Sequence, residues 1–318
     1  MARITYLGPE GTFTDAALLQ MTAAGLIPDQ GADAVQRLPV DSTPVALDAV
    51  RNGEADYACV PIENSIDGSV MPTLDSLAIG SPLQVFAETT LDVAFTIVVQ
   101  PGRGAADVRT VAAFPVAEAQ VRQWIAANLP GTEPLPAYSN ADAARQVAEG
   151  HADAGVTSPL AAARWKLAAL AEGVVDEANA RTRFVLVGLP GQPPVRTGND
   201  RTSVVLRIPN EPGALVTSLA EFGIRGIDLT RIESRPTRTE LGTYLFFADC
   251  VGHIDDFAVA EALKALHRRC ADVRYLGSWP TGAAAPVGAP PPDDAARWLE
   301  RLRDGKPAHG DASGGAGR

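Results

Sequence analysis

Lysine and histidine are scarce in this 318-residue chain, and long apolar runs are missing. The chain has three lysines and four histidines, no cluster of basic residues, and a formal net charge of -11. This charge balance argues against nucleic acid or an anionic membrane as the main partner. No apolar run approaches the roughly 18 residues that a membrane-spanning helix needs. The start, MARITYLGPEG, lacks the basic and then apolar layout of a signal peptide.

Cysteine is also rare. Cys59, Cys250 and Cys270 are odd in number and widely spaced, which suits reduced thiols in a cytoplasm. No histidine pairs with a cysteine at metal-ligand spacing, and the CxxC, HExxH and GxSxG motifs are absent. We therefore expect a cytoplasmic protein that holds no metal and no serine-hydrolase site.

The first 190 residues alternate strand-like and helical stretches. Runs rich in Val, Ile, Phe and Thr predict strands at 3–7, 37–40, 57–62, 85–99, 110–115 and 182–189. Thr43 before Pro44 and Ser158 before Pro159 fit helix N-caps followed by a first-turn proline. Such alternation predicts an α/β architecture with mostly parallel sheets.

The rest of the chain divides into a linker, a compact unit and a tail. Residues 191–200 are rich in Gly and Pro without periodicity, which is typical of a linker. Residues 201–280 follow the order β-α-β-β-α-β, the ferredoxin-like unit. Residues 281–318 are rich in Ala, Pro and Gly, and we expect a disordered tail, although its piece DDAARWLERLRD can dock as a helix.

The first motif, GPEGTFT at 8–14, lies between a predicted strand and a predicted helix. Such a junction presents free backbone N–H groups and the positive end of a helix dipole, where anions bind. It is neither GxGxxG nor a P-loop, so a nucleotide is not implied. Taken alone, it equally fits an ordinary turn capped by Thr12 or Thr14.

Two further motifs lie at strand ends of the same region. VPIENSIDGSV at 60–70 places polar residues where an apolar strand ends, and ligands of α/β sheets bind at that edge. Thr182, Arg183 and Phe184 begin the last strand before the linker. Alternation directs Thr182 and Phe184 to one face and Arg183 to the other. The plainer interpretation is a polar loop and a solvent-facing arginine.

The compact unit carries two more motifs, GALV at 213–216 and ESRP at 233–236. GALV opens the first helix of the unit, and ESRP closes its second strand. A helix N-terminus can hold a carboxylate and a buried glutamate can hold an ammonium group, which together suit an amino acid. The plainer interpretation is a capped helix and a surface ion pair.

In order and at these spacings, the five motifs resemble those of the prephenate dehydratase family. GPEGTFT, VPIENSIDGSV and TRF are similar to its catalytic signatures, and GALV and ESRP to those of its C-terminal ACT regulatory domain. The resemblance covers roughly residues 3–280. It implies a two-lobed catalytic domain, similar to type II periplasmic binding proteins, with the active site in the cleft. It also implies conversion of prephenate to phenylpyruvate, water and CO2 without a cofactor.

The resemblance assigns roles to individual positions. The family's essential threonine falls on Thr182, and its second motif places Glu63, Asn64 and Ser65 at the site. Arg183 and Phe184 complete the threonine motif, and a glutamine used by some members falls on Gln120. The expected substrate-binding residues are Gly11, Thr12, Phe13 and Ser65. The expected phenylalanine-binding residues are Gly213, Ala214, Leu215, Val216, Glu233 and Ser234.

One position departs from the family pattern. Many members have Ser-His-Pro where this chain has Ala113, Phe114 and Pro115, so a role given to that serine or histidine cannot operate here. The assignment of Gln120, which lies close by in the sequence, is weakened accordingly.

The implied chemistry makes demands that these residues can meet. Prephenate is a dianion, so we expect a locally positive pocket at the helix termini of 8–14, with Arg183 as a helper. Thr182 would donate to the leaving hydroxyl as an orienting group, because its own hydroxyl is too weak an acid to be the proton source. Glu63 would supply the proton if a closed cleft favoured its neutral form.

Partners and alternatives follow from the same resemblance. It implies a monofunctional enzyme, because no helical mutase-like domain precedes residue 1, and feedback by L-phenylalanine through a homodimer or homotetramer. Arogenate as the substrate stays open, since no residue decides it. A non-catalytic amino-acid sensor also stays open, although no DNA-binding helix-turn-helix or basic face is visible.

Overall fold

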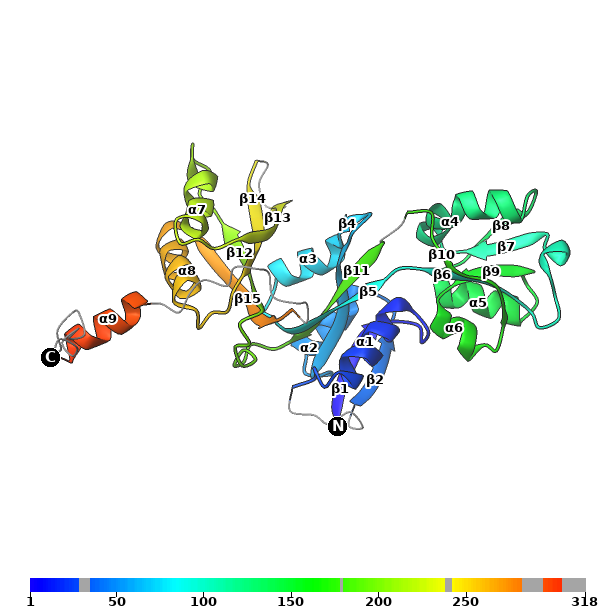
Figure 1. Ribbon diagram of the computed structural model, residues 1–318, viewed down its shortest axis with the longest axis horizontal. Coiled ribbons are helices and arrows are strands. Elements are labelled where there is room, and N and C mark those ends of the chain that lie inside the picture. The colour runs from blue at the N-terminus through cyan, green and yellow to red at the C-terminus, as the bar shows by residue number, and fades with distance from the viewer. Residues whose placement is uncertain (29–34, 178–179, 238–241, 282–293, 305–318) are drawn as a thin grey trace, which may run out of the picture.

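Three α/β bodies follow one another along the molecule (Figure 1). The structure, a computed structural model, describes residues 1–28, 35–177, 180–237, 242–281 and 294–304. The first lobe consists of β1 (Ala2–Leu7), α1 (Phe13–Ala23), β2 (Val35–Val40), α2 (Thr43–Arg51), β3 (Tyr57–Asn64), β4 (Gly68–Ser69), α3 (Met71–Ala78), β5 (Gln84–Asp92) and β11 (Arg181–Gly188). Its sheet has the order β2-β1-β3-β11-β5, with β4 paired to β3.

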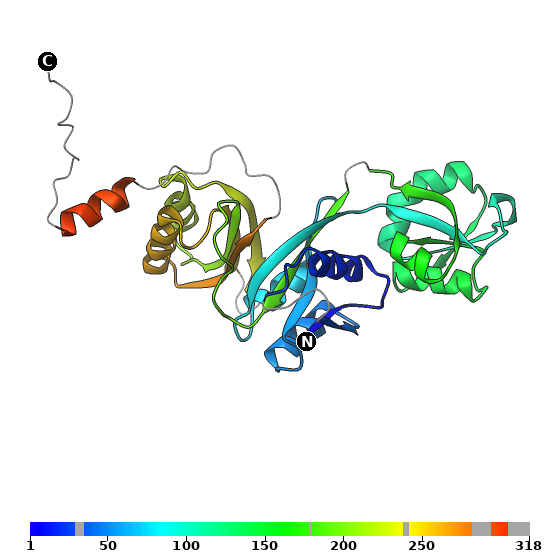
Figure 2. The same cartoon turned by 60° about the horizontal axis from the view of Figure 1, so that its bottom comes forward.

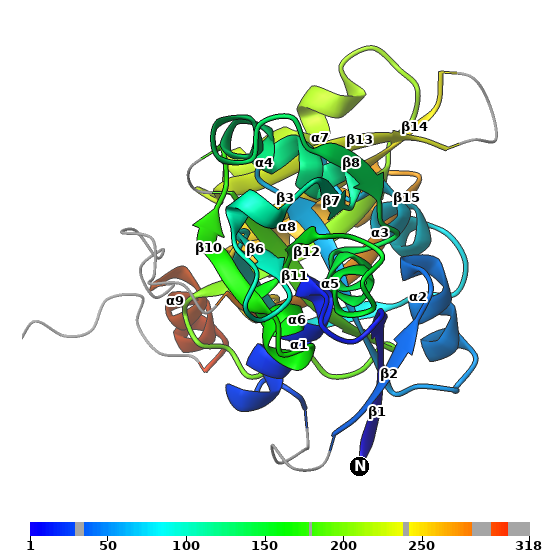
Figure 3. The ribbon, with the colours of Figure 1, turned by 90° about the vertical axis from the view of Figure 1, so that its right-hand side faces the viewer.

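The second lobe is inserted between β5 and β11. It consists of β6 (Phe95–Val99), the 3-10 turn η1 (Ala105–Asp107), β7 (Thr110–Ala113), α4 (Pro115–Asn128), β8 (Glu133–Pro136), α5 (Asn140–Ala148), β9 (Ala154–Thr157), α6 (Pro159–Arg164) and β10 (Ala168–Val174). Its sheet has the order β10-β6-β9-β7-β8. One face packs against α4 and the other against α5 and α6, as the view from this lobe shows (Figure 3).

The expectation of mostly parallel sheets is wrong. Pairs β1–β2, β1–β3, β7–β8 and β7–β9 are parallel, whereas β3–β11, β5–β11, β6–β9 and β6–β10 are antiparallel. The stretch predicted as one strand at 85–99 is divided between the lobes, with β5 ending at Asp92 and β6 beginning at Phe95. In Figure 2 this cyan segment crosses from one lobe to the other. The returning strand β11 runs antiparallel to its neighbours because the chain crosses twice.

Local signals set the helix starts. Ser158 caps α6, accepting a hydrogen bond from the backbone N–H of Ala161 (3.1 Å), as predicted. Thr12 caps α1 in the same way through Asp15. The cap of α2 is Ser42 and not Thr43, which forms the first turn with Pro44.

The compact unit has the predicted βαββαβ order. It comprises β12 (Asp200–Arg207), α7 (Ala214–Gly223), β13 (Leu229–Pro236), β14 (Tyr244–Val251), α8 (Phe257–Arg269) and β15 (Asp272–Pro280). The antiparallel order is β13-β14-β12-β15, with α7 and α8 packed on one face. The other face packs on the first lobe, where Phe247, Leu276 and Trp279 join one core with Val85 and Val185. The two units therefore share buried surface.

The tail begins after β15. Residues 282–293 and 305–318, on which most of the predicted disorder falls, lie outside the described residues. The amphipathic piece forms α9 (Asp294–Arg303). Its Trp298, Leu299 and Leu302 are exposed.

In the described parts of the chain, helices are too short or too polar to cross a bilayer. Within those same ranges, no three His, Cys, Asp or Glu residues gather as ligands for a metal ion.

Candidate functional site

Thr182 and Asn64 form a hydrogen-bonded pair where β11 emerges from the junction of the lobes. Asn64 Nδ2 donates to Thr182 Oγ1 over 3.0 Å. The other end of the amide is fixed, because Asn64 Oδ1 accepts from the backbone N–H groups of Ile66 (2.7 Å) and Asp67 (3.0 Å). Thr182 is 8% exposed, so its hydroxyl is held in a sheltered position. The structure thus brings together two of the predicted catalytic residues.

A bulge in β3 explains why Asn64 faces Thr182. The register pairs Thr182 with Asn64 and Arg183 with Glu63, but Phe184 with Pro61, so Ile62 is the extra residue. A bulge reverses the alternation of side chains beyond it. Strict alternation from the core residue Ile62 would have turned Asn64 to the opposite face.

The loop 8–14 links the two lobes. Ser158 Oγ, on the second lobe, donates to Gly11 O over 2.5 Å, and Arg164 forms an ion pair with Glu10. Phe13 packs edge-on against Phe95 at the start of the second lobe (ring centroids 5.7 Å apart). The loop therefore fastens the lobes together besides opening α1.

A cavity of about 760 Å³ lies between the lobes at this loop. Its walls include Thr12, Phe13 and Thr14 at the start of α1, and Ser139 and Asn140 at the start of α5. Two helix N-termini, one from each lobe, therefore reach the cavity, and each can receive an anion.

Among the described residues, no basic side chain lines this cavity, so side-chain charge does not supply the locally positive pocket that was expected. The charged residues on the wall of this cavity are Asp41 and Asp142. Asp142 is held by Arg145 and by the backbone N–H of Tyr138 (2.9 Å). The expectation of a locally positive pocket therefore reduces to the amide groups of the helix termini.

Arg183 is not available to a substrate, which corrects the expected role. Its side chain is 9% exposed and points to the face opposite Thr182, as alternation predicts. There it forms ion pairs with Glu63 (2.9 Å), Glu88 (3.2 Å) and Asp249 of the compact unit (2.8 Å). The plainer interpretation of a solvent-facing arginine is also wrong, because these carboxylates compensate a buried guanidinium.

The geometry also disagrees with the roles expected of Glu63 and Ser65. Glu63 shares the face of Arg183, so its carboxylate is an ion-pair partner there and not a proton donor aimed at Thr182. Ser65 Oγ accepts from the backbone N–H of Arg181 (2.9 Å), and Ser65 N donates to Arg181 O (2.8 Å). Ser65 therefore ties the end of β3 to the start of β11.

Phe184 and Gln120 occupy buried positions in different lobes. Phe184 is 2% exposed and packs in the core beneath α1, with Phe13 at its edge. Gln120 is 7% exposed on α4, and its Oε1 has no hydrogen-bond partner among the described residues. Phe184 thus supports the site from below, and Gln120 has a buried acceptor available.

The two effector motifs lie on different parts of the compact unit. Gly213 is the N-cap of α7 with φ +82°, and the neighbouring Leu215 and Val216 are exposed. Glu233 lies on the sheet face that meets the first lobe, where it accepts from Ser69 Oγ (3.1 Å). Ser234 is exposed and faces the other way along β13. A single chain therefore uses Glu233 as a contact between its own domains.

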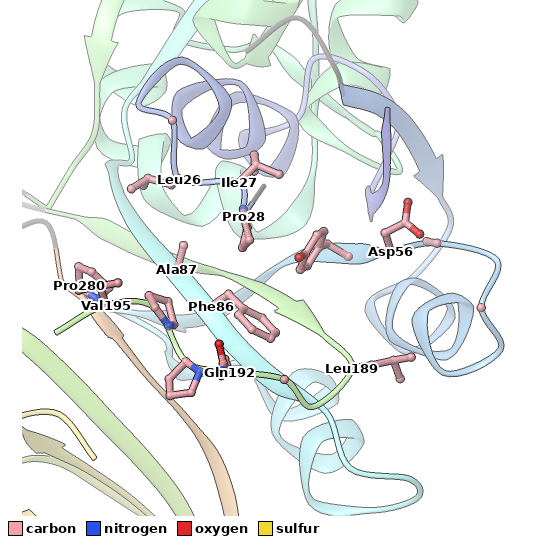
Figure 4. A pocket seen from close by; sticks show the side chains of 17 residues that line it. Leu26, Ile27, Pro28, Asp56, Phe86, Ala87, Leu189, Gln192, Val195 and Pro280 are labelled. Atoms are coloured by element: carbon pink, nitrogen blue, oxygen red, sulfur yellow. The ribbon is translucent and has the colours of Figure 1, made fainter. Parts of the chain in front are cut away.

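A cavity of about 1030 Å³ beneath the first lobe carries none of the motifs (Figure 4). Leu26, Phe86, Leu189 and Pro280 contribute apolar walls. The carboxylate of Asp56 on its rim is occupied by Arg3 (2.9 Å), and hydrogen bonds from Arg3 hold the pKa of Asp56 below its ordinary value. The cavity between the lobes is the better candidate for substrate binding, because its walls include the first motif, although Thr182, Asn64 and Gln120 are not among its lining residues.

Comparison with known proteins identifies the family of this chain. The family model "Prephenate dehydratase" matches residues 4–192, and the model "ACT domain" matches residues 202–268. The chain belongs to the prephenate dehydratase family. The curated prephenate dehydratase of Mycobacterium tuberculosis strain H37Rv is 80% identical over 309 residues, 96% of each chain.

Solved structures support the same family. The prephenate dehydratase of Arthrobacter aurescens, in complex with L-Phe, is 40% identical with a TM-score of 0.85, and the match covers 95% of this chain and 98% of that one. GqqA, described as a novel type of quorum-quenching acylase, is 29% identical with a TM-score of 0.76, covering 88% and 98%. Membership of the prephenate dehydratase family thus extends through both the catalytic and the ACT regions.

Sequence reasoning missed several residues of this prephenate dehydratase site. The sequence predicts Ser158 only as a cap, yet its hydroxyl also donates to Gly11 O across the lobes. Asn140 follows Ser139 at a helix start, and that N-cap pattern was the available signal. Asp249 lies within an apolar strand, where a lone buried carboxylate signals a partner.

Gly11 gives a direct test of the contact between the lobes. It has φ +91°, and a Cβ there would lie 3.1 Å from Ala161 Cβ on the second lobe. Gly11→Ala is expected to lower the free energy of unfolding by about 1–2 kcal/mol through backbone strain and to raise KM by pushing the lobes apart. Gly25→Ala is the matched control, because Gly25 has φ +68° with open space around it. Thermal unfolding and KM are measured for both, and an equal KM in the two variants would contradict the prediction.

Proposed function

We propose that this protein converts prephenate to phenylpyruvate, water and CO2. The observation that carries the proposal is the Thr182 hydroxyl, held by Asn64 at the junction of the lobes, in a chain of the prephenate dehydratase family. The cavity between the lobes, about 760 Å³, offers room for a small dianion.

The reaction needs little covalent chemistry from the protein. The bond between the ring and its carboxylate breaks to release CO2, and that electron pair enters the ring. The C–O bond breaks at the same time, the hydroxyl leaves with one proton as water, and the ring becomes aromatic. Thr182 donates a hydrogen bond to the leaving oxygen, and Asn64 holds it in that direction. The proton does not come from Glu63, which faces Arg183.

The substrate carboxylates are bound at the helix starts of the cleft. Backbone N–H groups after Thr12 on α1 and after Ser139 on α5 are oriented towards the cavity end of each helix. Binding between two lobes excludes water from the departing carboxylate. Gln120 is not among the residues that line this cavity, so its buried Oε1, unpaired among the described residues, takes no part in this binding scheme.

Regulation by L-phenylalanine is part of the proposal. The ACT region and the Arthrobacter aurescens relative, solved with L-Phe, support it. The site combines the start of α7 with Ser234 of a second copy, because Glu233 is engaged by Ser69 of its own chain, and such a shared site requires a homodimer or homotetramer. We place this enzyme in the cytoplasm, as its reduced, widely spaced cysteines suggest.

The test is an assay at neutral pH. Purified protein is incubated with prephenate, and phenylpyruvate is followed by its absorbance in alkali, with and without phenylalanine. Formation of phenylpyruvate that slows with phenylalanine is the expected result. Turnover of arogenate alone would reassign the substrate. Binding of phenylalanine without turnover of either compound would contradict an enzyme and favour an amino-acid sensor.

A further inference from the structure

Six charged side chains from the catalytic domain and the ACT unit meet on the face of β11 opposite Thr182. This ion cluster comprises Glu63, Glu88, Arg183, Arg201, Arg231 and Asp249. Three arginines thus face three carboxylates. Four of the side chains are less than a tenth exposed, with Arg201 (19%) and Glu63 (39%) at the rim.

Asp249 is a buried contact between the two domains. It lies fully buried on β14 of the ACT unit, where its carboxylate accepts from Ser203 Oγ (2.7 Å) and from two nitrogens of Arg231 (2.9 and 3.1 Å). It also accepts from Nη2 of Arg183, which belongs to the catalytic strand, over 2.8 Å. Without Asp249, three arginines would face two carboxylates.

The catalytic side of the cluster is equally well fixed. Glu88 on β5 accepts hydrogen bonds from Arg183 (3.2 Å), Arg201 (3.1 Å) and the indole N–H of Trp279 (2.9 Å). Trp279 and Arg201 belong to the ACT sheet, so each side of the interface supplies charge to the other. Apart from Arg231 Nη1, which has no hydrogen-bond partner among the described residues, the buried polar atoms of this network are paired, and such pairing favours one arrangement of the two sheets.

Arg183 directly follows Thr182, and the two side chains lie on opposite faces of β11. Each residue also contacts β3: Thr182 accepts a hydrogen bond from Asn64 (3.0 Å), and Arg183 forms an ion pair with Glu63 (2.9 Å). A guanidinium fixed on one face restrains the backbone that presents the hydroxyl on the other.

We propose that Asp249 of the ACT unit, acting through Arg183, is a positioning residue that holds the Thr182 hydroxyl in its working geometry. The inference rests on the proposed role of Thr182 in the dehydration. It also gives the ACT sheet a route to the cleft, because any shift of β14 that an effector caused would move Asp249 and with it the anchor of β11.

The experiment compares full-length variants in the prephenate assay. Asp249→Asn keeps the shape and removes the charge, and it is expected to lower kcat by about 10- to 100-fold with KM within about twofold. Maximal inhibition by phenylalanine is expected to weaken. Asp75→Asn is the matched control for kcat, because Asp75 pairs with Arg235 across the same interface (2.7 Å) but lies on α3. Its kcat is expected to stay within about twofold of wild type.

A second variant separates positioning from stability. Arg231→Gln with Asp249→Asn restores equal charge without restoring the bridge to Arg183. Its thermal unfolding temperature is expected to recover towards the wild-type value while kcat stays low. The double variant also tests the positioning role if Asp249→Asn alone does not fold.

Two results would overturn the inference. One is a folded Asp249→Asn protein with wild-type kcat, and the other is recovery of kcat together with stability in the double variant. Failure of the wild-type protein to convert prephenate would contradict the proposed function instead, so the two failures are distinguishable.

Discussion

Thr182→Val is expected to lower kcat for prephenate by about 10²- to 10³-fold, because the leaving hydroxyl loses its oriented hydrogen-bond donor. Valine has nearly the same shape, and Thr182 is almost buried, so the fold and the helix starts that receive the carboxylates are kept. The dissociation constant of the substrate is therefore expected to change little. Steady-state kinetics and equilibrium binding of prephenate measure the two quantities separately.

Thr182→Ser provides the control, because serine keeps a hydroxyl within reach of Asn64 Nδ2. It is expected to retain most of the activity. Comparable turnover by the valine and serine variants would show that the hydroxyl takes no part in the reaction. A parallel loss of binding and turnover in the valine variant would point to a substrate-binding role.

Asp249→Ala is expected to lower the free energy of unfolding by about 3–5 kcal/mol, because it leaves the buried guanidinium groups of Arg183 and Arg231 short of a partner. Asp75→Ala breaks the partly exposed pair with Arg235 and is expected to cost less, about 1 kcal/mol or below. Urea unfolding at neutral pH measures both. Equal losses of unfolding free energy in the two variants would mean that burial of the ion cluster does not add to its contribution to stability.

The same carboxylate predicts a dependence on pH. Burial raises the pKa of Asp249, but Arg231, Arg183 and the Ser203 hydroxyl outweigh burial, and the net pKa lies well below the ordinary value. A depressed pKa contributes stability that is fully present above the unfolded pKa, about 3.9, and is lost as pH falls towards the folded pKa. The difference in unfolding free energy between wild type and Asp249→Asn is thus expected to shrink below about pH 4. Unfolding curves at neutral pH and at low pH measure it, and a constant difference would contradict the assignment.

Local patterns in the sequence determined much of this protein. Patterns over a few neighbouring residues predict the element order of the ferredoxin-like unit at 201–280. They also predict the caps at Thr12 and Ser158 and the opposite faces of Thr182 and Arg183. They depend on capping and on the two-residue period of a strand, which operate over a few positions. The order of the motifs was also sufficient to identify the family.

Only the tertiary structure decided how the site is assembled. The bulge at Ile62 turned Asn64 towards Thr182, and the double crossing between lobes made β11 antiparallel to its neighbours. Arg183 pairs with Asp249, which lies 66 residues further along the chain, and this ion pair directs the guanidinium away from the substrate. A buried charge takes whichever opposite charge the packing of distant strands brings near, and local sequence does not contain that information.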